Sequence, residues 1–261
     1  MNIVVCLKQV PGVTQVKVDP QTGALVRPAV KPILNPLDTY ALEEGVRLKE
    51  RFGGTVIGLT MGPPQAVDML REAISVGADE VILLSDAALA DSDTLATAAV
   101  LALAIRKIGS FGLVICGRQA LDGDTGQVGP QLAEMLGLPF IAYVSKVEEA
   151  TATTLRVQRA VDEGKETIEA PLPAVITVVK EINNPRLFSL RGLQKAKTVP
   201  VPVWTAGDIG ADPAAIGSAG SATRIVKYSV PERARRGEVL QGELAEQLDA
   251  LVTRLKEAHL A

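Results

Sequence analysis

The sequence is poor in the residue types that carry out chemistry on their own. Its 261 residues include two cysteines, one histidine and only 3% aromatic residues. This supply cannot build a conventional zinc site or a serine–histidine–aspartate triad, and it offers no stacking platform for single-stranded nucleic acid. We therefore assign no catalytic residue and no metal ligand. Any redox chemistry must come from a bound cofactor.

A strong net charge and long apolar runs are also lacking. The formal net charge of −3 gives no electrostatic reason to expect a nucleic-acid partner. No apolar run is long enough to span a bilayer, and no signal peptide precedes the first apolar strand, so we expect a cytoplasmic protein. With 47% hydrophobic and 22% charged residues, the chain has the composition of a globular protein with a sizeable core.

What the first half contains is an alternation of apolar strands and amphipathic helices. The predicted strands are 2–8, 55–60, 80–84 and 112–116, and the predicted helices are 35–53, 65–77, 92–109 and 127–137. Asn35 is expected to cap the first helix, and Asp91 or Ser92 the third. Repeated strand–helix units with short connections predict a doubly wound, mostly parallel α/β sheet covered on both faces.

Other segments follow different patterns. A short hairpin is predicted at 15–18 and 24–27. Residues 140–149, 153–160, 165–169 and 174–180 predict an antiparallel addition to the sheet, with Pro171 and Pro173 at an interruption or edge. The Gly/Ala/Ser-rich segment 206–223 predicts a linker. The amphipathic helix near 240–258 could fold back onto the core or dock on another subunit, and its separation by the linker favours the second.

A glycine-rich loop after the strand 112–116 is the main candidate site. It reads Gly117-Arg-Gln-Ala-Leu-Asp-Gly-Asp-Thr-Gly-Gln-Val-Gly-Pro130 and leads into a helix. Loop N–H groups and a helix N-terminus together attract an anion, and Arg118 could add a full positive charge. Ligands of such sheets bind beyond the carboxyl ends of the strands. We therefore expect the segments 8–11, 61–63 and 117–126 to meet in one crevice, with a nucleotide phosphate at the glycine loop. The alternative is a tight turn whose glycines serve only positive φ.

The wording of this loop closely resembles the nucleotide loop of electron-transfer flavoprotein β subunits. Four further segments resemble that family in the same order: Leu7-Lys-Gln-Val-Pro11, Asn35-Pro36-Leu37-Asp38, Met61-Gly62-Pro63 and Asn183-x-Pro185-Arg186 with Leu190 and Lys195-Ala-Lys197. The resemblance covers nearly the whole chain. It implies an adenine nucleotide α-hydrolase-like domain over 1–180, a partner recognition loop over 181–204, and a linker and helix over 205–261 that dock on the α subunit.

The resemblance also implies two sets of binding residues. The cofactor-binding set is Cys6, Asn35, Pro36, Leu37, Asp38, Met61, Asp93, Thr94, Thr97, Arg118, Gln119, Asp122, Gly123, Asp124, Thr125, Gly126, Gln127, Val128, Gly129 and Pro130. The partner-binding set is Glu166, Asn183, Pro185, Arg186, Leu190, Lys195 and Lys197. Leu190 would anchor a partner dehydrogenase, and Glu166 would steer the mobile FAD domain of the α subunit. Taken alone, 181–204 equally predicts a short helix packed on its own domain, and Glu166 a solvated turn carboxylate.

Two details resemble the electron-bifurcating branch of the family, in which the β subunit holds FAD. Gly123 follows Asp122 where AMP-binding members carry more acidic residues, and Asp93-Thr94-Leu95-Ala96-Thr97 begins a helix beside the loop. A diphosphate needs more N–H donors and fewer nearby carboxylates than AMP does. The resemblance thus implies a second FAD in the α subunit and NADH as the donor. The implied acceptors are ferredoxin or flavodoxin, and an acyl-CoA dehydrogenase or quinone-linked oxidoreductase.

Alternative functions remain open at this point. The first is a non-bifurcating electron transfer flavoprotein with AMP in this chain. The second is a stand-alone adenine-nucleotide-binding regulator of the universal-stress type, which shares the sheet and the glycine loop but leaves residues 181–204 unexplained. An ATP-pyrophosphatase is less favoured because its Ser-Gly-Gly-x-Asp-Ser phosphate loop is absent.

Overall fold

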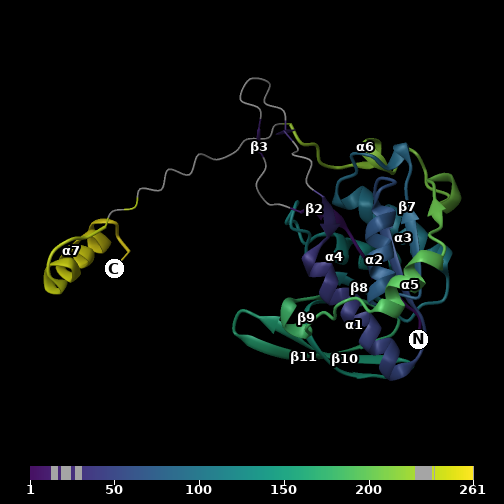
Figure 1. Ribbon diagram of the computed structural model, residues 1–261, viewed down its shortest axis with the longest axis horizontal. Helices are drawn as coiled ribbons and strands as arrows, with labels where there is room; N and C mark the ends of the chain where they lie inside the picture. The colour runs from purple at the N-terminus through teal and green to yellow at the C-terminus, as the bar shows by residue number, and fades with distance from the viewer. Residues whose placement is uncertain (13–16, 19–24, 27–30, 227–236, 238, 261) are drawn as a thin grey trace.

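The computed structural model describes residues 1–12, 17–18, 25–26, 31–226, 237 and 239–260. Its centre is a nine-stranded sheet in the order β11-β10-β9-β12-β8-β1-β6-β7-β13 (Figure 1). The strands of this sheet are β1 (Ile3–Cys6), β6 (Val56–Met61), β7 (Glu80–Leu84), β8 (Leu113–Gly117), β9 (Phe140–Ala150), β10 (Thr154–Val161), β11 (Gly164–Pro171), β12 (Ala174–Val178) and β13 (Val203–Trp204). Two small pairs accompany it: β2 (Gln9–Pro11) with β5 (Pro32–Leu34), and β3 (Lys17–Val18) with β4 (Leu25–Val26).

Helices cover both faces of the parallel part of the sheet, as the sequence predicts. The covering helices include α1 (Pro36–Phe52), α2 (Ala66–Val76), α3 (Thr94–Ile108) and α4 (Val128–Leu136). The later helices are α5 (Leu190–Thr198), α6 (Gly217–Gly220) and α7 (Leu244–Glu257), and the 3-10 turns are η1 (Ala87–Leu89), η2 (Lys180–Ile182) and η3 (Gly207–Ile209). Alternate residues of β1 enter two separate hydrophobic clusters: Ile3 and Val5 pack with α1 and α2, whereas Val4 and Cys6 pack with α3 and α4. Burial on both faces explains why β1 is apolar throughout.

The helix ends follow local signals, with one correction. Pro36 occupies the first turn of α1, and Gly53, Gly77 and Gly109 follow the ends of the first three helices with positive φ, where glycine carries no steric cost. The cap of α3 is neither Asp91 nor Ser92. It is Asp93, whose carboxylate accepts a hydrogen bond from the Ala96 N–H at 3.0 Å.

The second half of the chain corrects the predicted antiparallel addition. Strands β9, β10 and β11 are antiparallel, as expected, and Pro171 ends the edge strand β11. Strand β12, however, is parallel to both neighbours and lies between β8 and β9, inside the sheet. The pair β3 and β4 is antiparallel and agrees with the predicted hairpin, whose turn lies outside the described residues.

Residues 206–223 do not form the loose linker that their composition predicts. Ala206, Ile209 and Ile216 are buried in the cluster formed with α3 and α4. Small residues are needed here because a Cβ at Gly217 would overlap the carbonyl oxygen of Ala88. Helix α7, in contrast, has no buried residue, and Figure 1 shows it apart from the sheet.

Candidate nucleotide site

The site lies where the direction of strand addition reverses. From β1 the chain adds β6 and β7 on one side, and then returns to place β8 on the other side of β1. The helix α1 packs on one face of the sheet and α4 on the other. The carboxyl ends of two such neighbouring strands open a crevice, which is where ligands of doubly wound sheets bind.

A cavity of about 1050 Å³ occupies this position. That volume is at the upper end of the roughly 300–1,000 Å³ typical of small-molecule sites. The segments after β1, β6 and β8 meet there, as the sequence predicts. A smaller hollow of about 260 Å³ between α1 and β9 contains none of the predicted cofactor-binding residues.

The cavity contains most of the residues predicted to bind a cofactor. Those that line it are Cys6, Asn35, Asp38, Met61, Asp93, Thr94, Thr97, Arg118, Gln119, Gly123, Thr125, Gly126, Gln127, Val128 and Gly129. Five predicted residues do not line it: Pro36, Leu37, Asp122, Asp124 and Pro130. Twelve residues outside the predicted set do: Leu7, Lys8, Asp91, Ser92, Leu101, Gly117, Ala120, Ser218, Ser221, Thr223, Arg224 and Ile225.

Asn35 fixes the glycine loop to the start of α1. It stands at the N-cap position, but its side chain makes no capping hydrogen bond, which corrects the sequence prediction. Its Nδ2 donates instead to the Gln119 carbonyl at 2.9 Å, and its Oδ1 accepts from the Leu121 N–H at 3.2 Å. A buried amide satisfied in this way holds the loop in one place.

Asp38 forms a buried carboxyl at the floor of the site. Its Oδ2 accepts a hydrogen bond from the Lys8 N–H at 2.8 Å. Burial raises its pKa to about 7, because the charged form loses its hydration. Gly117 permits this close packing, since a Cβ there would lie 2.8 Å from the carbonyl carbon of Leu37.

The glycine loop also contacts the end of β1. The Lys8 ammonium donates to both carboxylate oxygens of Asp122, at 2.7 and 2.8 Å. Gly126 adopts φ +64°, a left-handed conformation that favours glycine. Arg118 lies over the ring of Tyr143, 5.1 Å from its centroid, so the expected free cation at the loop is engaged in a cation–π contact.

The side of the cavity opposite the glycine loop is closed by a wall of small polar residues, Ser218, Ser221 and Thr223, which the sequence analysis did not predict. Asp93 holds it: one carboxylate oxygen accepts from the Thr223 N–H at 2.8 Å and from its hydroxyl at 3.0 Å, and the Asp93 N–H donates to Ser221 Oγ at 2.8 Å. Thr94 Oγ1 donates to Gln127 Oε1 at 2.9 Å and so joins the first turns of α3 and α4. The only sequence signal for this wall was its serine and threonine content.

The donors around the cavity fit a nucleotide bearing phosphates. Loop N–H groups, the N-terminus of α4, serine and threonine hydroxyl groups of the lining and the cations Lys8 and Arg224 can all meet phosphate oxygens. A Cβ at Gly123 would meet nothing within 4 Å, so the loop surface there is open. No group of His, Cys, Asp or Glu in the described part of the chain could hold a metal ion.

Two cysteines lie side by side in the sheet, and one of them, Cys6, lines the cavity. Cys6 and Cys116 are paired positions of β1 and β8, and both are buried and free. Hydrogen bonding to Cys6, together with burial, raises the pKa of the Cys116 thiol. Since the thiolate is the reactive form, this environment makes Cys116 an unreactive thiol.

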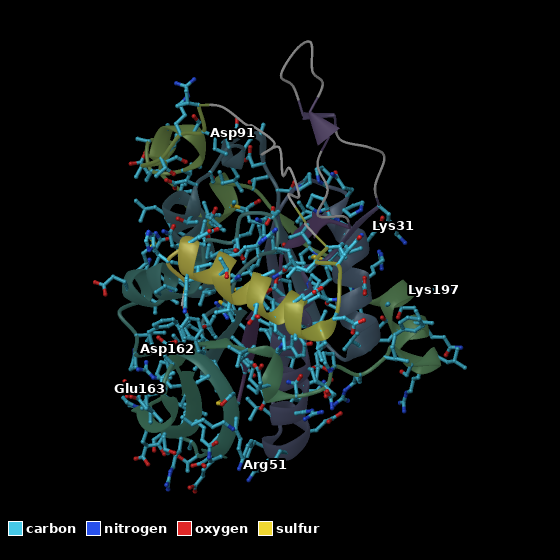
Figure 2. All side chains as sticks on the ribbon, turned by 90° about the vertical axis from the view of Figure 1, so that its left-hand side faces the viewer. Lys31, Arg51, Asp91, Asp162, Glu163 and Lys197 are labelled. Carbon is cyan, nitrogen blue, oxygen red and sulfur yellow. The ribbon has the colours of Figure 1, made fainter. Side chains whose placement is uncertain are left out.

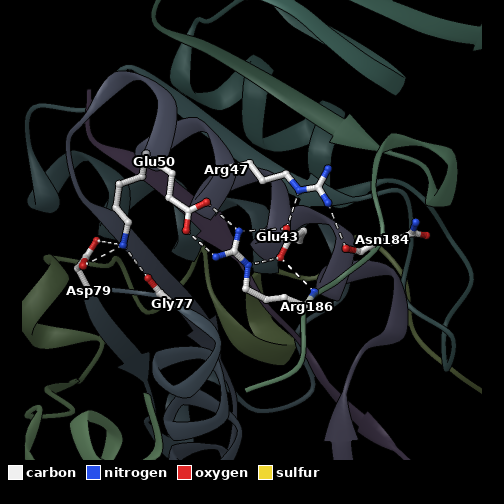
Figure 3. A network of polar contacts seen from close by, with 8 residues as sticks. Glu43, Arg47, Glu50, Gly77, Asp79, Asn184 and Arg186 are labelled. Atoms are coloured by element: carbon white, nitrogen blue, oxygen red, sulfur yellow. Dashed lines mark hydrogen bonds and ion pairs between the residues drawn. The ribbon is translucent and has the colours of Figure 1, made fainter. Parts of the chain in front are cut away.

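The predicted partner loop is fastened to α1 and α2 by several of its own polar residues. Asn183 donates to the Tyr40 carbonyl and to Glu44 Oε2, both at 3.0 Å. Figure 3 shows the Arg186 guanidinium between Glu43 and Glu50, with Nε 2.8 Å from Glu43 Oε2. Lys195 Nζ donates to the Ala78 carbonyl at 3.0 Å. These three predicted partner-binding residues therefore have structural contacts within the chain.

The apolar residues of the same loop are left on the surface. Leu187, Phe188 and Leu190 are 87%, 57% and 82% exposed. Pro185 and Lys197 are exposed as well. In Figure 2, Lys197 lies across the molecule from the β10–β11 turn at Asp162 and Glu163. Glu166 belongs to strand β11 rather than to a turn, and its Oε2 accepts from Arg159 Nε at 2.8 Å.

Comparison with known proteins agrees with this architecture. A profile of the electron transfer flavoprotein domain family matches residues 22–209. A protein named electron transfer flavoprotein subunit beta from Clostridium acetobutylicum is 45% identical over 259 residues, covering 99% of each chain. CarD of Acetobacterium woodii, a subunit of a caffeyl-CoA reductase–Etf complex, is 45% identical over 264 residues and all of both chains.

A third relative extends the comparison to another reductase. The acryloyl-CoA reductase electron transfer subunit gamma of Anaerotignum propionicum is 38% identical over 268 residues, covering all of both chains. No helix among the residues described is long and apolar enough to cross a membrane. The full-length identity, the family match and the sheet described above agree, and the chain belongs to the electron transfer flavoprotein family, as a β subunit.

Proposed function

We propose that this chain holds FAD in the cavity beyond β1 and β8 and acts as the β subunit of an electron-bifurcating electron transfer flavoprotein. The observation that carries the proposal is the extent of the cavity. It continues from the glycine loop past the first turn of α3 to the wall formed by Ser218, Ser221 and Thr223. AMP would use the phosphate donors at the loop, whereas a dinucleotide would use the full length.

The charges around the cavity support a ligand with two phosphates. Asp38 is protonated below pH 7 because burial raises its pKa to about 7. Asp93 is already engaged with the N–H groups of Ala96 and Thr223. Asp38 therefore presents less negative charge to a diphosphate below pH 7. Burial alone would raise the pKa of Asp93, but these hydrogen bonds hold it below its usual value, so Asp93 keeps its charge and directs it to its own N–H donors. AMP remains the alternative ligand, in a non-bifurcating protein.

The protein would contribute positioning rather than its own redox groups. A flavin bound here would accept hydride from NADH and pass on single electrons, one toward ferredoxin or flavodoxin and one through the α-subunit FAD. The glycine loop and the N-terminus of α4 would hold its phosphates. The wall from Asp93 to Thr223 would limit access of water to the reacting end.

The surface of the partner loop supports a protein partner. Leu187, Phe188 and Leu190 project from a segment whose base is fastened by Asn183 and Arg186. Exposed apolar anchors on a rigid base are typical of binding hot spots. The names of two relatives contain a CoA-thioester reductase, which supports an acyl-CoA dehydrogenase as the partner here. Helix α7, which has no buried residue, is proposed to dock on the α subunit.

The proposal is tested by counting cofactors. The chain is co-expressed with its α subunit, the complex is denatured, and the released flavin and adenine nucleotides are separated and quantified. We expect two FAD and no AMP per heterodimer. One FAD and one AMP would reject bifurcation and support simple electron transfer.

A glycine variant tests whether one of the two flavins is bound by this chain. Gly126→Val places a β-branched residue at φ +64°, which costs about 1–2 kcal/mol of backbone strain and displaces the loop. We expect the flavin count to fall from two to one, with the α-subunit FAD retained. Retention of both flavins would show that the loop does not hold a cofactor. Gly109→Val, which places the same residue at φ +89° with nothing within 4 Å and outside the cavity lining, is the matched control.

A further inference from the structure

The carboxylate of Asp122 is bound in the way an anionic ligand would be. Lys8 Nζ lies 2.7 and 2.8 Å from its two oxygens, and the Gly123 N–H donates to Oδ1 at 2.9 Å. An ammonium group and a loop N–H are the donors that phosphate oxygens also accept. The side chain of Asp122 therefore satisfies a small anion site made of Lys8 and Gly123.

These donors belong to the cavity, whereas the carboxylate does not. Lys8 and Gly123 line the cavity, and Asp122 lies outside its lining. Among the other cationic residues of the lining, Arg118 stacks on Tyr143 and Arg224 belongs to the opposite wall. Lys8 is thus the lining cation that pairs with a carboxylate of the glycine loop.

The ion pair between Lys8 and Asp122 can be replaced by another pair at a low cost in free energy. The side chains of Lys8 and Asp122 are 48% and 34% exposed, so water and salt weaken their attraction. A phosphate brings more negative charge and more acceptor oxygens than one carboxylate does. When both anions can reach the same donors, the phosphate should prevail, and the carboxylate turns to solvent.

We propose that Lys8 and the Gly123 N–H are phosphate ligands, and that the Asp122 carboxylate competes with the bound phosphate for them. The inference rests on the proposed nucleotide site and adds a source of selectivity to it. A ligand without phosphate leaves the Lys8–Asp122 pair in place and gains no affinity from Lys8. Asp122 thereby lowers the affinity for phosphate-bearing ligands while Lys8 raises it, so their removal should have opposite effects.

The experiment is calorimetric titration of the heterodimer after its adenine nucleotide has been removed. ADP, which carries the diphosphate of FAD without its flavin, is compared with adenosine. We expect Lys8→Met to weaken ADP binding about tenfold, as loss of a charged ligand does, and Asp122→Asn to strengthen it about threefold. Adenosine binding should stay within about twofold in both variants. Asp124→Asn, which removes a neighbouring charge that has no ion pair to Lys8, should change ADP binding less than Asp122→Asn.

The double variant Lys8→Met/Asp122→Asn separates competition from simple repulsion. If Asp122 acts through Lys8, the gain from Asp122→Asn should shrink at least twofold when Lys8 is absent. Additive effects, unchanged ADP affinity in Lys8→Met, or an equal loss for adenosine would each overturn the inference while leaving the nucleotide site intact. Failure of the unmodified complex to bind ADP would reject the nucleotide site, and this inference with it.

Discussion

Two buried acidic residues of α1, Asp38 and Glu43, are used in opposite ways. In the first turn of this helix, Asp38 faces the nucleotide cavity and forms no ion pair with any residue that the structure describes, so burial raises its pKa to about 7. Further along the helix, Glu43 is just as buried but receives Arg186 and Arg47 at 2.8 and 2.6 Å. The same helix therefore presents a carboxyl that becomes neutral to the cavity, and a charged one to the partner loop.

The adjacent residues Glu43 and Glu44 show that the group bonded to a buried carboxyl decides in which direction its pKa shifts. Burial alone would raise the pKa of Glu43, but the Arg186 and Arg47 guanidiniums hold it below its usual value. Burial does raise the pKa of Glu44, whose neighbour is the neutral amide of Asn183. A carboxylate with an arginine fork stabilises the loop it holds, whereas one without a cation is stable only when protonated. Replacing Asp38 should therefore change the pH dependence of stability, whereas replacing Arg186 should lower the free energy of unfolding.

The largest expected effect is a change in the pH dependence of stability through Asp38→Asn. The ordinary pKa of 3.8 applies to the unfolded chain and about 7 to the folded one. The stabilisation is full when the carboxyl is protonated in both states, and it is lost as the pH rises through 7. From these pKa values, the group should remove about 3 kcal/mol of stability between pH 5 and pH 8.

Urea denaturation of the heterodimer across this pH range measures the effect. Asp38→Asn has no ionisable group at this position, so the decline in stability above pH 5 should be smaller in the variant. Parallel pH profiles for the variant and the unmodified protein would show that Asp38 is ionised throughout. That outcome would remove the contrast between the neutral carboxyl of Asp38 and the charged carboxylate of Glu43.

An intermediate effect on stability is expected from Arg186→Met, which removes a cation that pairs with Glu43. The change leaves the buried Glu43 with Arg47 alone, and Glu50 loses its two hydrogen bonds to the guanidinium. We expect a loss of about 2 kcal/mol in the free energy of unfolding, less than for a fully buried pair because Arg186 is partly exposed. Bound nucleotide should not change.

Two further variants define what Arg186 contributes. Arg186→Lys keeps the charge but not the planar fork, so it should recover only part of the stability. Arg191→Met removes an exposed arginine from the same loop and should change stability by less than about 0.5 kcal/mol. Equal stability of Arg186→Met and the unmodified protein would show that the ion pair does not hold the loop.

Local patterns predicted most of the framework that places the cavity. The apolar strands, the glycines that end α1, α2 and α3, and the loop from Gly117 to Pro130 are all signalled by neighbouring residues. Because the carboxyl ends of parallel strands share one edge, these signals also predicted which segments meet. The bounds of β6 and β8 differ from the prediction by a residue or so.

What could not be predicted depends on contacts between distant residues. Asn35 has the sequence context of a helix cap, but it bonds residues of the loop 84 and 86 positions away. The segment 206–223 has the composition of a linker, although its small residues serve close packing against η1 and α3. The position of β12 between β8 and β9 follows from the order of the whole sheet. Its nearly continuous apolar run, buried at every residue as in β1, is compatible with an inner strand but does not say which strands are its neighbours.

The smallest expected effect, and the most specific, comes from Leu190→Ala. Leu190 is 82% exposed and begins α5, next to the Ser189 cap that accepts from the Gly192 N–H at 2.9 Å. An exposed leucine contributes little to folding, so stability should change by less than about 0.5 kcal/mol. If it fills a pocket on an acyl-CoA dehydrogenase, its truncation should weaken that complex by about 1–2 kcal/mol, or roughly 5–30-fold.

The measurement is electron transfer from a partner acyl-CoA dehydrogenase as a function of its concentration, with flavin content determined in parallel. Ile33→Ala, an exposed apolar residue of β5 outside the partner loop, is the control for general loss of surface area. A lower affinity in Leu190→Ala at constant cofactor content and stability would place partner recognition in the exposed part of the loop. An affinity equal to that of the control would show that the loop of Arg186 is a structural clasp, and that the partner binds elsewhere.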